Sequence, residues 1–176
     1  MPSKVQQFVC SDCVTYAKSR IKFNTFNTFN NVTTIANLCP DIELQKLLDN
    51  KVSVKTSATE SHTIRTYSDE DRPNIGLGDE FIDVGLNGGI RSITEDMSIF
   101  QGNLMLSVYV KLLPDNRAKK KIIKQIISQC EEITHRRESN GYFFHIDPSN
   151  VITPTTSNLT SGYSTTILNV VWRYIK

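Results

Sequence analysis

The residues that could bind a metal or carry thiol chemistry are scattered along this sequence. The cysteines are Cys10, Cys13, Cys39 and Cys130. Cys10 and Cys13 form a CxxC pair, but a structural zinc site needs a second ligand pair at matching spacing, and none follows. We interpret the cysteines as reduced packing residues, with metal binding and redox chemistry as the alternatives.

The histidines are equally dispersed, at His62, His135 and His145. His145 and Asp147 could place two metal ligands on one face of a strand. No third ligand lies nearby in the sequence, so a hydrogen bond at the end of the strand is the favoured interpretation.

A group of carboxylates could bind a divalent cation. Its members are Asp69, Glu70, Asp71, Asp79 and Asp83. Their spacing differs from that of an EF-hand, so we favour a solvated acidic loop.

Motifs for nucleotide binding and acyl transfer are absent from the sequence. Gly76 and Gly78 are followed by Phe81 where a dinucleotide fingerprint needs its third glycine. Neither a GxxxxGK[ST] loop nor a GxSxG elbow occurs. We therefore predict that the protein is not an enzyme and uses no cofactor or metal.

Composition indicates one globular domain. The chain has 176 residues, of which 39% are hydrophobic and 22% charged, and its net charge is +2. No stretch approaches the roughly 18 apolar residues of a membrane span. The N-terminus has no apolar core of signal-peptide length, so we expect synthesis in the cytoplasm and no membrane partner.

Charge is nevertheless distributed unevenly. Residues 60–96 contain nine carboxylates and three arginines, a balance of −6, whereas residues 115–138 contain seven Lys/Arg and four carboxylates, a balance of +3. The basic face consists of Lys119, Lys120, Lys121 and Lys124. A solvated face is favoured, with a protein contact and nucleic-acid binding as alternatives, and the opposed patches favour head-to-tail association.

The first fifty residues read as a helical region. Helical periodicity predicts helices over 3–21 and 41–49, the second capped by Asp41. Between them, Phe23, Phe26 and Phe29 recur every three residues. These aromatics either plug the core or form a strip that docks on a partner.

Residues 51–100 are predicted to form strands and an arm. Val52 and Val54 alternate with polar residues in a first short strand. Phe81–Ile93 reads as a β-hairpin because Asn87 and Gly88 stand between two alternating runs, and Asn-Gly favours a tight hairpin turn. We expect this hairpin to project and to contact a partner.

Residues 101–176 predict a strand, a helix and two further strands. The strand ends near Leu112. The helix runs from about Asn116 to Arg137, is capped by Asp115 and is stopped by Asn140-Gly141. Strands over 142–146 and 165–174 follow, joined by a surface loop, and Trp172 lies on the apolar face of the last strand.

These elements predict an α+β fold of one domain. Its core is an antiparallel or mixed β-sheet with one long amphipathic helix packed across it, and N-terminal helices and the projecting hairpin complete it.

Three segments of the C-terminal half resemble the tail-completion or tail-terminator family of tailed bacteriophages. They are the strand Gly102–Lys111, the Ile-rich helix Lys119–Ile133 and the closing strand Gly162–Tyr174. Family members share a long strand, one amphipathic helix across the sheet and a final strand of alternating apolar and aromatic residues.

The resemblance implies a non-enzymatic virion subunit that forms a homo-oligomeric ring at the head–tail junction. Its partners would be portal or adaptor and tail proteins, and DNA would pass through the lumen. A head-completion adaptor, a minor tail protein and a small enzyme or ligand-binding protein are the alternatives.

Overall fold

The computed structural model describes residues 38–57, 59–68, 71–73, 77–95, 98–136, 138–155 and 162–176, without the side chains of 136 and 147–155. The predicted helix over 3–21 and the Phe23–Phe29 strip lie outside these residues. Pro40–Lys176 forms one compact unit. Its elements are α3 (Pro40–Leu48), β1 (Ser53–Lys55), β2 (Ser61–Thr63), β3 (Arg65–Ser68), β4 (Glu80–Leu86), β5 (Arg91–Ser92), β6 (Ile99–Lys111), α4 (Lys120–Arg136), β7 (Glu138–Ser139), β8 (Tyr142–Thr155) and β9 (Tyr163–Ile175).

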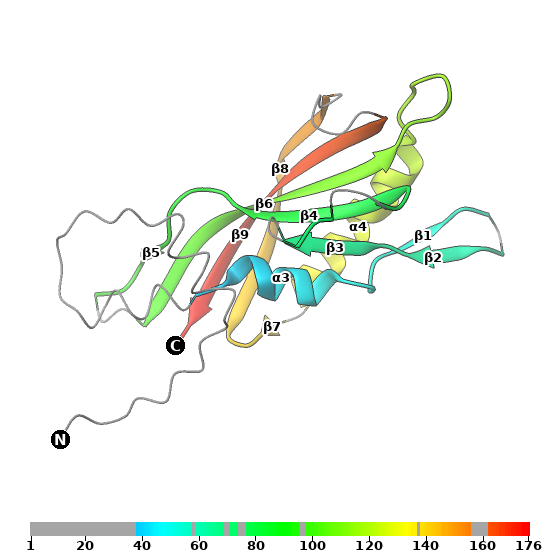
Figure 1. The fold of residues 1–176 in the computed structure, drawn as a ribbon. Helices are drawn as coiled ribbons and strands as arrows, with labels where there is room; N and C mark the ends of the chain where they lie inside the picture. The colour runs from blue at the N-terminus through cyan, green and yellow to red at the C-terminus, as the bar shows by residue number, and fades with distance from the viewer. Residues whose placement is uncertain are drawn as a thin grey trace. The chain divides into compact units, whose positions relative to one another are not determined.

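The main sheet is mixed and curled into a half-barrel, which fits the predicted α+β class. Its strand order is β3-β4-β6-β9-β8-β7, and β5 pairs with β6 beyond the end of β4 (Figure 1). Only β3 and β4 are parallel; every other pair is antiparallel. The long pair of β6 and β9 therefore forms the middle of the sheet.

One face of this sheet lines the hydrophobic core. The alternation predicted for the closing strand is confirmed, because Leu168, Val170 and Trp172 on β9 are completely buried. Trp172 lies opposite Gly102 of β6, where a Cβ atom would stand 2.8 Å from the indole Nε1. Only glycine fits at this position, since any side chain would have to displace a buried ring.

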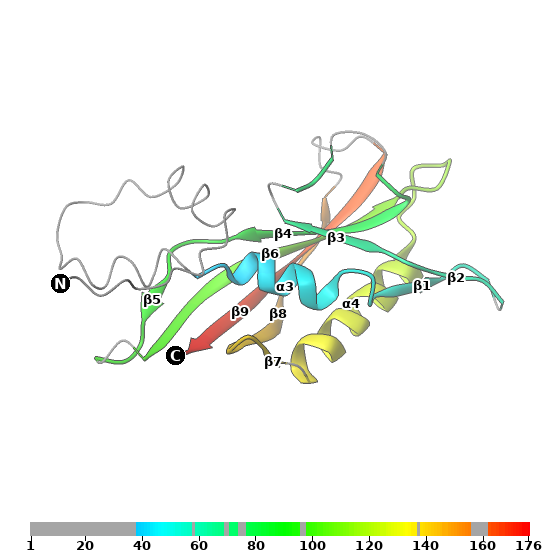
Figure 2. The ribbon, with the colours of Figure 1, turned by 60° about the horizontal axis from the view of Figure 1, so that its bottom comes forward.

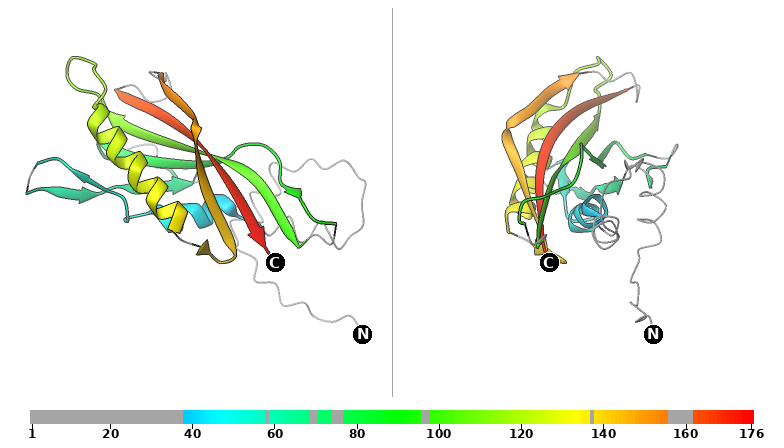
Figure 3. Two further views of the ribbon diagram at one scale, coloured as in Figure 1. Left: turned by 180° about the vertical axis from the view of Figure 1, so that it is seen from behind. Right: turned by 90° about the vertical axis from the view of Figure 1, so that its left-hand side faces the viewer.

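The helix α4 supplies the amphipathic element that the sequence predicts. Ile126 and Cys130 on its inner side are fully buried, and the helix contacts β8, β6 and β1 (Figure 3). Burial raises the pKa of the Cys130 thiol to about 12, so this cysteine is a neutral packing residue.

Both predicted helix caps are wrong by position. α4 begins at Lys120, and the Asp115 carboxylate accepts bonds from the backbone and side chain of Arg117 before the helix starts. α3 begins at Pro40, a residue that suits the first helical position, so Asp41 lies inside the first turn.

Cys39, just before this helix, is disulfide-bonded, which contradicts the expectation of four reduced thiols.

The predicted Phe81–Ile93 hairpin does not form. β4 and β5 both pair with the same edge of β6, the first opposite Leu104–Val110 and the second opposite Phe100 and Gln101. Asn87 continues this pairing by donating its backbone N–H to the carbonyl of Asn103, at 3.0 Å. β4 is buried between β3 and β6, so it is an interior strand and leaves no edge for β5.

The second Asn-Gly pair makes the tight turn instead. Asn140 and Gly141 have φ angles of 50° and 81° and join β7 to β8, where we predicted only the end of a helix. The surface loop predicted over 147–162 is also wrong in its first half, since β8 continues to Thr155.

A different hairpin extends from the sheet. β1 and β2 pair antiparallel, and their turn closes through bonds from Thr56 and Ser57 to the carbonyl of Glu60. Figure 2 shows this hairpin reaching past β3, with α3 and α4 beside it.

Candidate functional site

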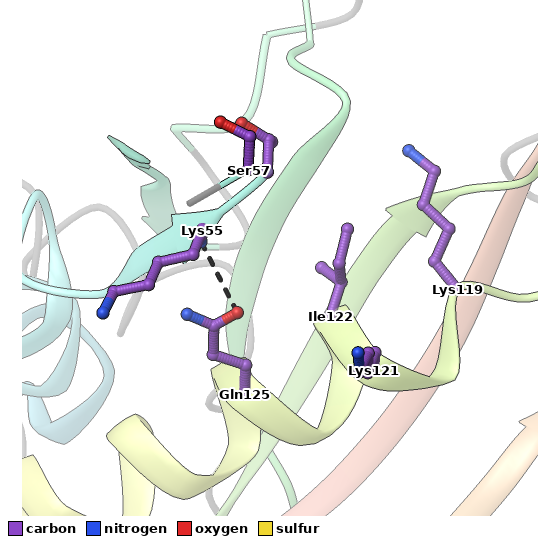
Figure 4. A pocket seen from close by; sticks show the side chains of 7 residues that line it. Lys55, Ser57, Lys119, Lys121, Ile122 and Gln125 are labelled. Carbon is purple, nitrogen blue, oxygen red and sulfur yellow. Dashed lines mark hydrogen bonds between the residues drawn. The ribbon is translucent and has the colours of Figure 1, made fainter. Parts of the chain in front are cut away.

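A groove of about 560 Å³ lies between the β1–β2 hairpin and the first turns of α4 (Figure 4). Three lysines, two hydroxyl residues, one amide and one aliphatic residue line it. They are Lys55, Thr56, Ser57, Lys119, Lys121, Ile122 and Gln125. Two of the four predicted basic-face residues therefore border a hollow that also includes a lysine from the hairpin.

Two glutamines of α4 hold the hairpin wall of this groove in place. The Gln129 side chain accepts a hydrogen bond from the backbone N–H of Ser53 at 2.9 Å and donates one to the carbonyl of Ser53 at 2.6 Å. Gln125 accepts the N–H of Lys55 at 3.5 Å. The amides thus occupy the outer edge of β1 as a neighbouring strand would.

A buried carboxylate anchors the two walls to the sheet. Glu80 of β4 has a side chain only 2% exposed, and it contacts His62 of β2 at 3.0 Å and Lys119 at 3.6 Å. Removing such a partner leaves a buried charge unpaired, so Lys119 has a structural role that the other basic-face residues lack.

The ammonium groups of the groove do not converge on one point. Figure 4 shows Lys55 and Lys119 pointing in different directions and Lys121 pointing toward the viewer. An extended anionic segment suits this arrangement better than a single small ion does.

Lys120, Lys121 and Lys124 are exposed, and none of them has an ion pair within the part of the chain that the structure describes. The basic face of α4 therefore consists of three solvent-facing charges, with Lys119 turned to Glu80.

The acidic residues singled out in the sequence differ from these lysines, because those that the structure describes have partners within the chain. Asp79 pairs with Lys111 at 3.0 Å, and Asp83 pairs with Arg72. The bond from Lys111 lowers the pKa of Asp79. The Asp71 carboxylate accepts bonds from Ser68 and Gln45, while Asp69 and Glu70 lie outside the described residues.

Asp71, Asp79 and Asp83 thus have separate partners, and the described residues contain no group of three His, Cys, Asp or Glu that could hold a metal ion. His145 is exposed on β8, and the side chain of Asp147 lies outside the described residues. Asn87 and Gly88 are exposed at the point where β4 gives way to β5. Phe23, Phe26 and Phe29 also lie outside the described residues.

Sequence reasoning missed Lys55 as part of the site, because it lies 64 positions before Lys119 and on another element. The segment Thr56–Glu60, four of whose five residues are polar, lies between Val54 and Ile64 and was the available signal for a hairpin there.

The groove can bind by charge and hydrogen bonding, and its lining includes no cysteine, histidine or carboxylate. Among the described residues, no helix is long and apolar enough to cross a membrane. No family model matches the sequence, and no curated protein matches it.

Proposed function

We propose that this protein is a structural subunit of a tailed bacteriophage that assembles into a ring at the head–tail junction. The supporting observation is that the three segments that carry the family resemblance form one body. β6 and β9 pair along the full 13 residues of β6, and α4 packs on the same sheet.

The work of such a subunit is mechanical. The ring joins the portal or adaptor to the tail, and DNA passes through its lumen. These tasks need a stiff body and specific contact surfaces. A central sheet of long antiparallel strands with a buried tryptophan and a covering helix provides the body.

A ring requires a head-to-tail interface, in which each subunit presents two different complementary surfaces. The basic face of α4 is a candidate for one of them, because Lys120, Lys121 and Lys124 have no ion-pair partner among the described residues. Their charges are free to meet a carboxylate-bearing surface of the next subunit.

The test is assembly of the purified full chain. Native mass spectrometry should give one closed oligomer, and negative-stain electron microscopy should show rings with a central opening. Phage tails that lack this protein should gain the ability to join heads when the ring is added. A chain that stays monomeric at every concentration, alone and with tails, would contradict the proposal.

A charge-reversed variant separates this interface from a merely solvated face. K120E/K121E/K124E should prevent rings at low salt and recover part of the assembly at high salt, because exposed charges are screened over ~8 Å at physiological ionic strength. Lys119 is left unchanged because it contacts buried Glu80.

A further inference from the structure

The lysines at the start of α4 stand where they weaken the helix. Lys120 and Lys121 occupy its first turn, which contains no acidic residue, and Lys124 follows one turn later. The N-terminal end of a helix carries a partial positive charge, so cations are unfavourable there. Lys124 also repels the other two lysines, because residues three and four apart are neighbours on a helix surface. These charges act against the stability of α4, and a bound anion would offset their repulsion.

Both walls of the groove beside these lysines are held in place without using its free ammonium groups. The hairpin wall is bonded to α4 through two glutamine amides, and buried Glu80 anchors Lys119 at the helix wall. Lys55 and Lys121 form no ion pair within the described part of the chain. A groove formed before binding loses little conformational freedom when a ligand enters it.

The groove offers separated cations, one amide donor and one aliphatic wall. Lys55 comes from β1 and Lys121 from α4, and their side chains point in different directions, so they suit two carboxylates better than a single anion (Figure 4). The Gln125 Nε2 donates no hydrogen bond to the described residues, so it can donate to a carbonyl of a ligand. Ile122 provides the aliphatic wall.

An extended polypeptide fits this lining better than nucleic acid does. Single-stranded nucleic acid binds by stacking its bases on aromatic side chains, and the lining contains none. A hollow of about 560 Å³ is too small to admit a DNA duplex, whose major groove alone is about 12 Å wide. A polypeptide brings carboxylates, backbone carbonyls and aliphatic side chains together on one narrow chain.

The exposed carboxylates of this chain are poor candidates for the occupant. The adjacent Asp79 and Glu80 both have cationic partners. Glu60, Glu95 and Glu138 each stand without a second described carboxylate on the same extended segment. The described residues therefore favour a segment of another protein over a second copy of this chain.

We propose that the groove binds an extended acidic segment of another protein. One carboxylate of the segment lies at Lys55, a second lies at Lys121, and an aliphatic side chain between them packs against Ile122. Gln125 donates to a backbone carbonyl of the segment. The inference goes beyond the ring proposal and does not depend on it, because the groove is complete within one copy of the chain.

Fluorescence anisotropy of a labelled peptide on the full chain tests this binding. The probe consists of glutamates around a central isoleucine and has blocked ends, and its match has glutamines in place of the glutamates. The glutamate peptide should bind saturably, with one peptide per chain, and more weakly at high salt. The glutamine peptide should bind about tenfold more weakly or worse, because it lacks the charges that face the lysines.

Two variants with the same change in net charge locate the site. K55E/K121E reverses two groove lysines, whereas K120E/K124E reverses two lysines of the same helix that do not line the groove. K55E/K121E should weaken binding of the glutamate peptide by about tenfold or more, because it puts like charges together. K120E/K124E should weaken it by about twofold at most, since exposed charges at a distance are screened. Circular dichroism should be unchanged in both variants.

Each contrary outcome has a distinct meaning. Equal losses in the two variants would reveal attraction to net charge alone and would overturn the groove as the site. Tighter binding of a labelled oligonucleotide of equal charge would overturn the polypeptide partner. A wild type that binds no peptide, together with rings that K55E/K121E alone abolishes, would assign the groove to a second copy and overturn the proposal. A wild type that binds the peptide and never forms rings would contradict only the ring proposal.

Discussion

The two Asn-Gly pairs of this chain have the same sequence and opposite structural roles. Asn140-Gly141 has two positive φ angles and reverses the chain between β7 and β8. At Asn87-Gly88 only the glycine has a positive φ, of 93°, and the chain continues along the edge of β6.

The difference comes from what surrounds each pair. β8 pairs with β9 on one side and has its other side available for β7. β4 is already paired with β3 and β6, so the residues after Asn87 cannot fold back on it. Asn-Gly therefore makes a reversal available, and the neighbouring strands decide whether it occurs.

The turn at Asn140-Gly141 is also fixed from outside. The Glu43 carboxylate on α3 accepts bonds from Ser139 Oγ at 2.9 Å and from Asn140 Nδ2 at 2.8 Å. Around Gly88, by contrast, an added Cβ would meet nothing within 4 Å. Four substitutions should reveal this contrast in the free energy of unfolding.

The largest effect is expected for Gly141→Val. A Cβ at Gly141 would lie 3.0 Å from the carbonyl oxygen of Ile175 and 3.2 Å from the Tyr174 ring, and a β-branched residue strongly disfavours positive φ. We expect a loss on the order of 3 kcal/mol by urea denaturation. Gly89→Val, at an open site without positive φ, is the control, and equal losses for the two variants would contradict the assignment.

Next in size is Glu43→Ala. This variant removes the acceptor for Ser139 and Asn140 from a side chain that is only 11% exposed. The expected cost is about 1–2 kcal/mol, because two hydrogen bonds are lost at a buried side chain. Lys46→Ala removes only the exposed ammonium that pairs with Glu43 and should cost about 0.5 kcal/mol or less. If both variants unfold at the same urea concentration, Glu43 does not hold the turn.

A smaller effect is expected for Gly88→Ala. The site has room for a methyl group, so only the positive φ opposes alanine, at about 1 kcal/mol. Asparagine tolerates this backbone region better, so Gly88→Asn should be more stable than Gly88→Ala in the same urea titration. The reverse order would mean that side-chain contacts, and not backbone conformation, govern this position.

The smallest effect is expected for Asn87→Ala. Asn87 contributes its backbone N–H to β6, and its exposed side chain makes no hydrogen bond to the described residues. The free energy of unfolding of Asn87→Ala should differ from that of the wild type by less than about 0.5 kcal/mol. Asn140→Ala, which loses the bond to Glu43 and places alanine at positive φ, should be measurably less stable in a parallel thermal melt. A large loss of stability in Asn87→Ala would contradict this assignment and favour a hairpin turn at Asn87-Gly88.

Patterns with a short period were predictable. The alternation of β9 identified the buried face that contains Trp172, and the apolar stripe of α4 identified Ile126 and Cys130 as core residues. Both patterns show which side of a single helix or strand is buried, and that information lies within a few consecutive residues.

The groove was only partly predictable. The lysine run marked the helix wall, since three consecutive lysines followed by Lys124 about one turn later indicate a solvent face. Lys55 could not be assigned to the same site, because Gln129 brings Ser53 to α4 across 76 positions of sequence. The acidic surplus of residues 60–96 did not indicate that Asp79 and Asp83 pair with Lys111 and Arg72.

The sequence by itself determined the α+β class, the amphipathic faces of α4 and β9, and the overall charge asymmetry, because each follows from local composition and periodicity. Only the tertiary structure decided which strands have free edges. It placed Glu80 between His62 and Lys119, assigned the reversal to Asn140-Gly141, and brought Lys55 of the β1–β2 hairpin to the groove that Lys119 and Lys121 line. These outcomes depend on pairing between distant segments, and a strand's availability for pairing is a property of its neighbours, which no local pattern encodes.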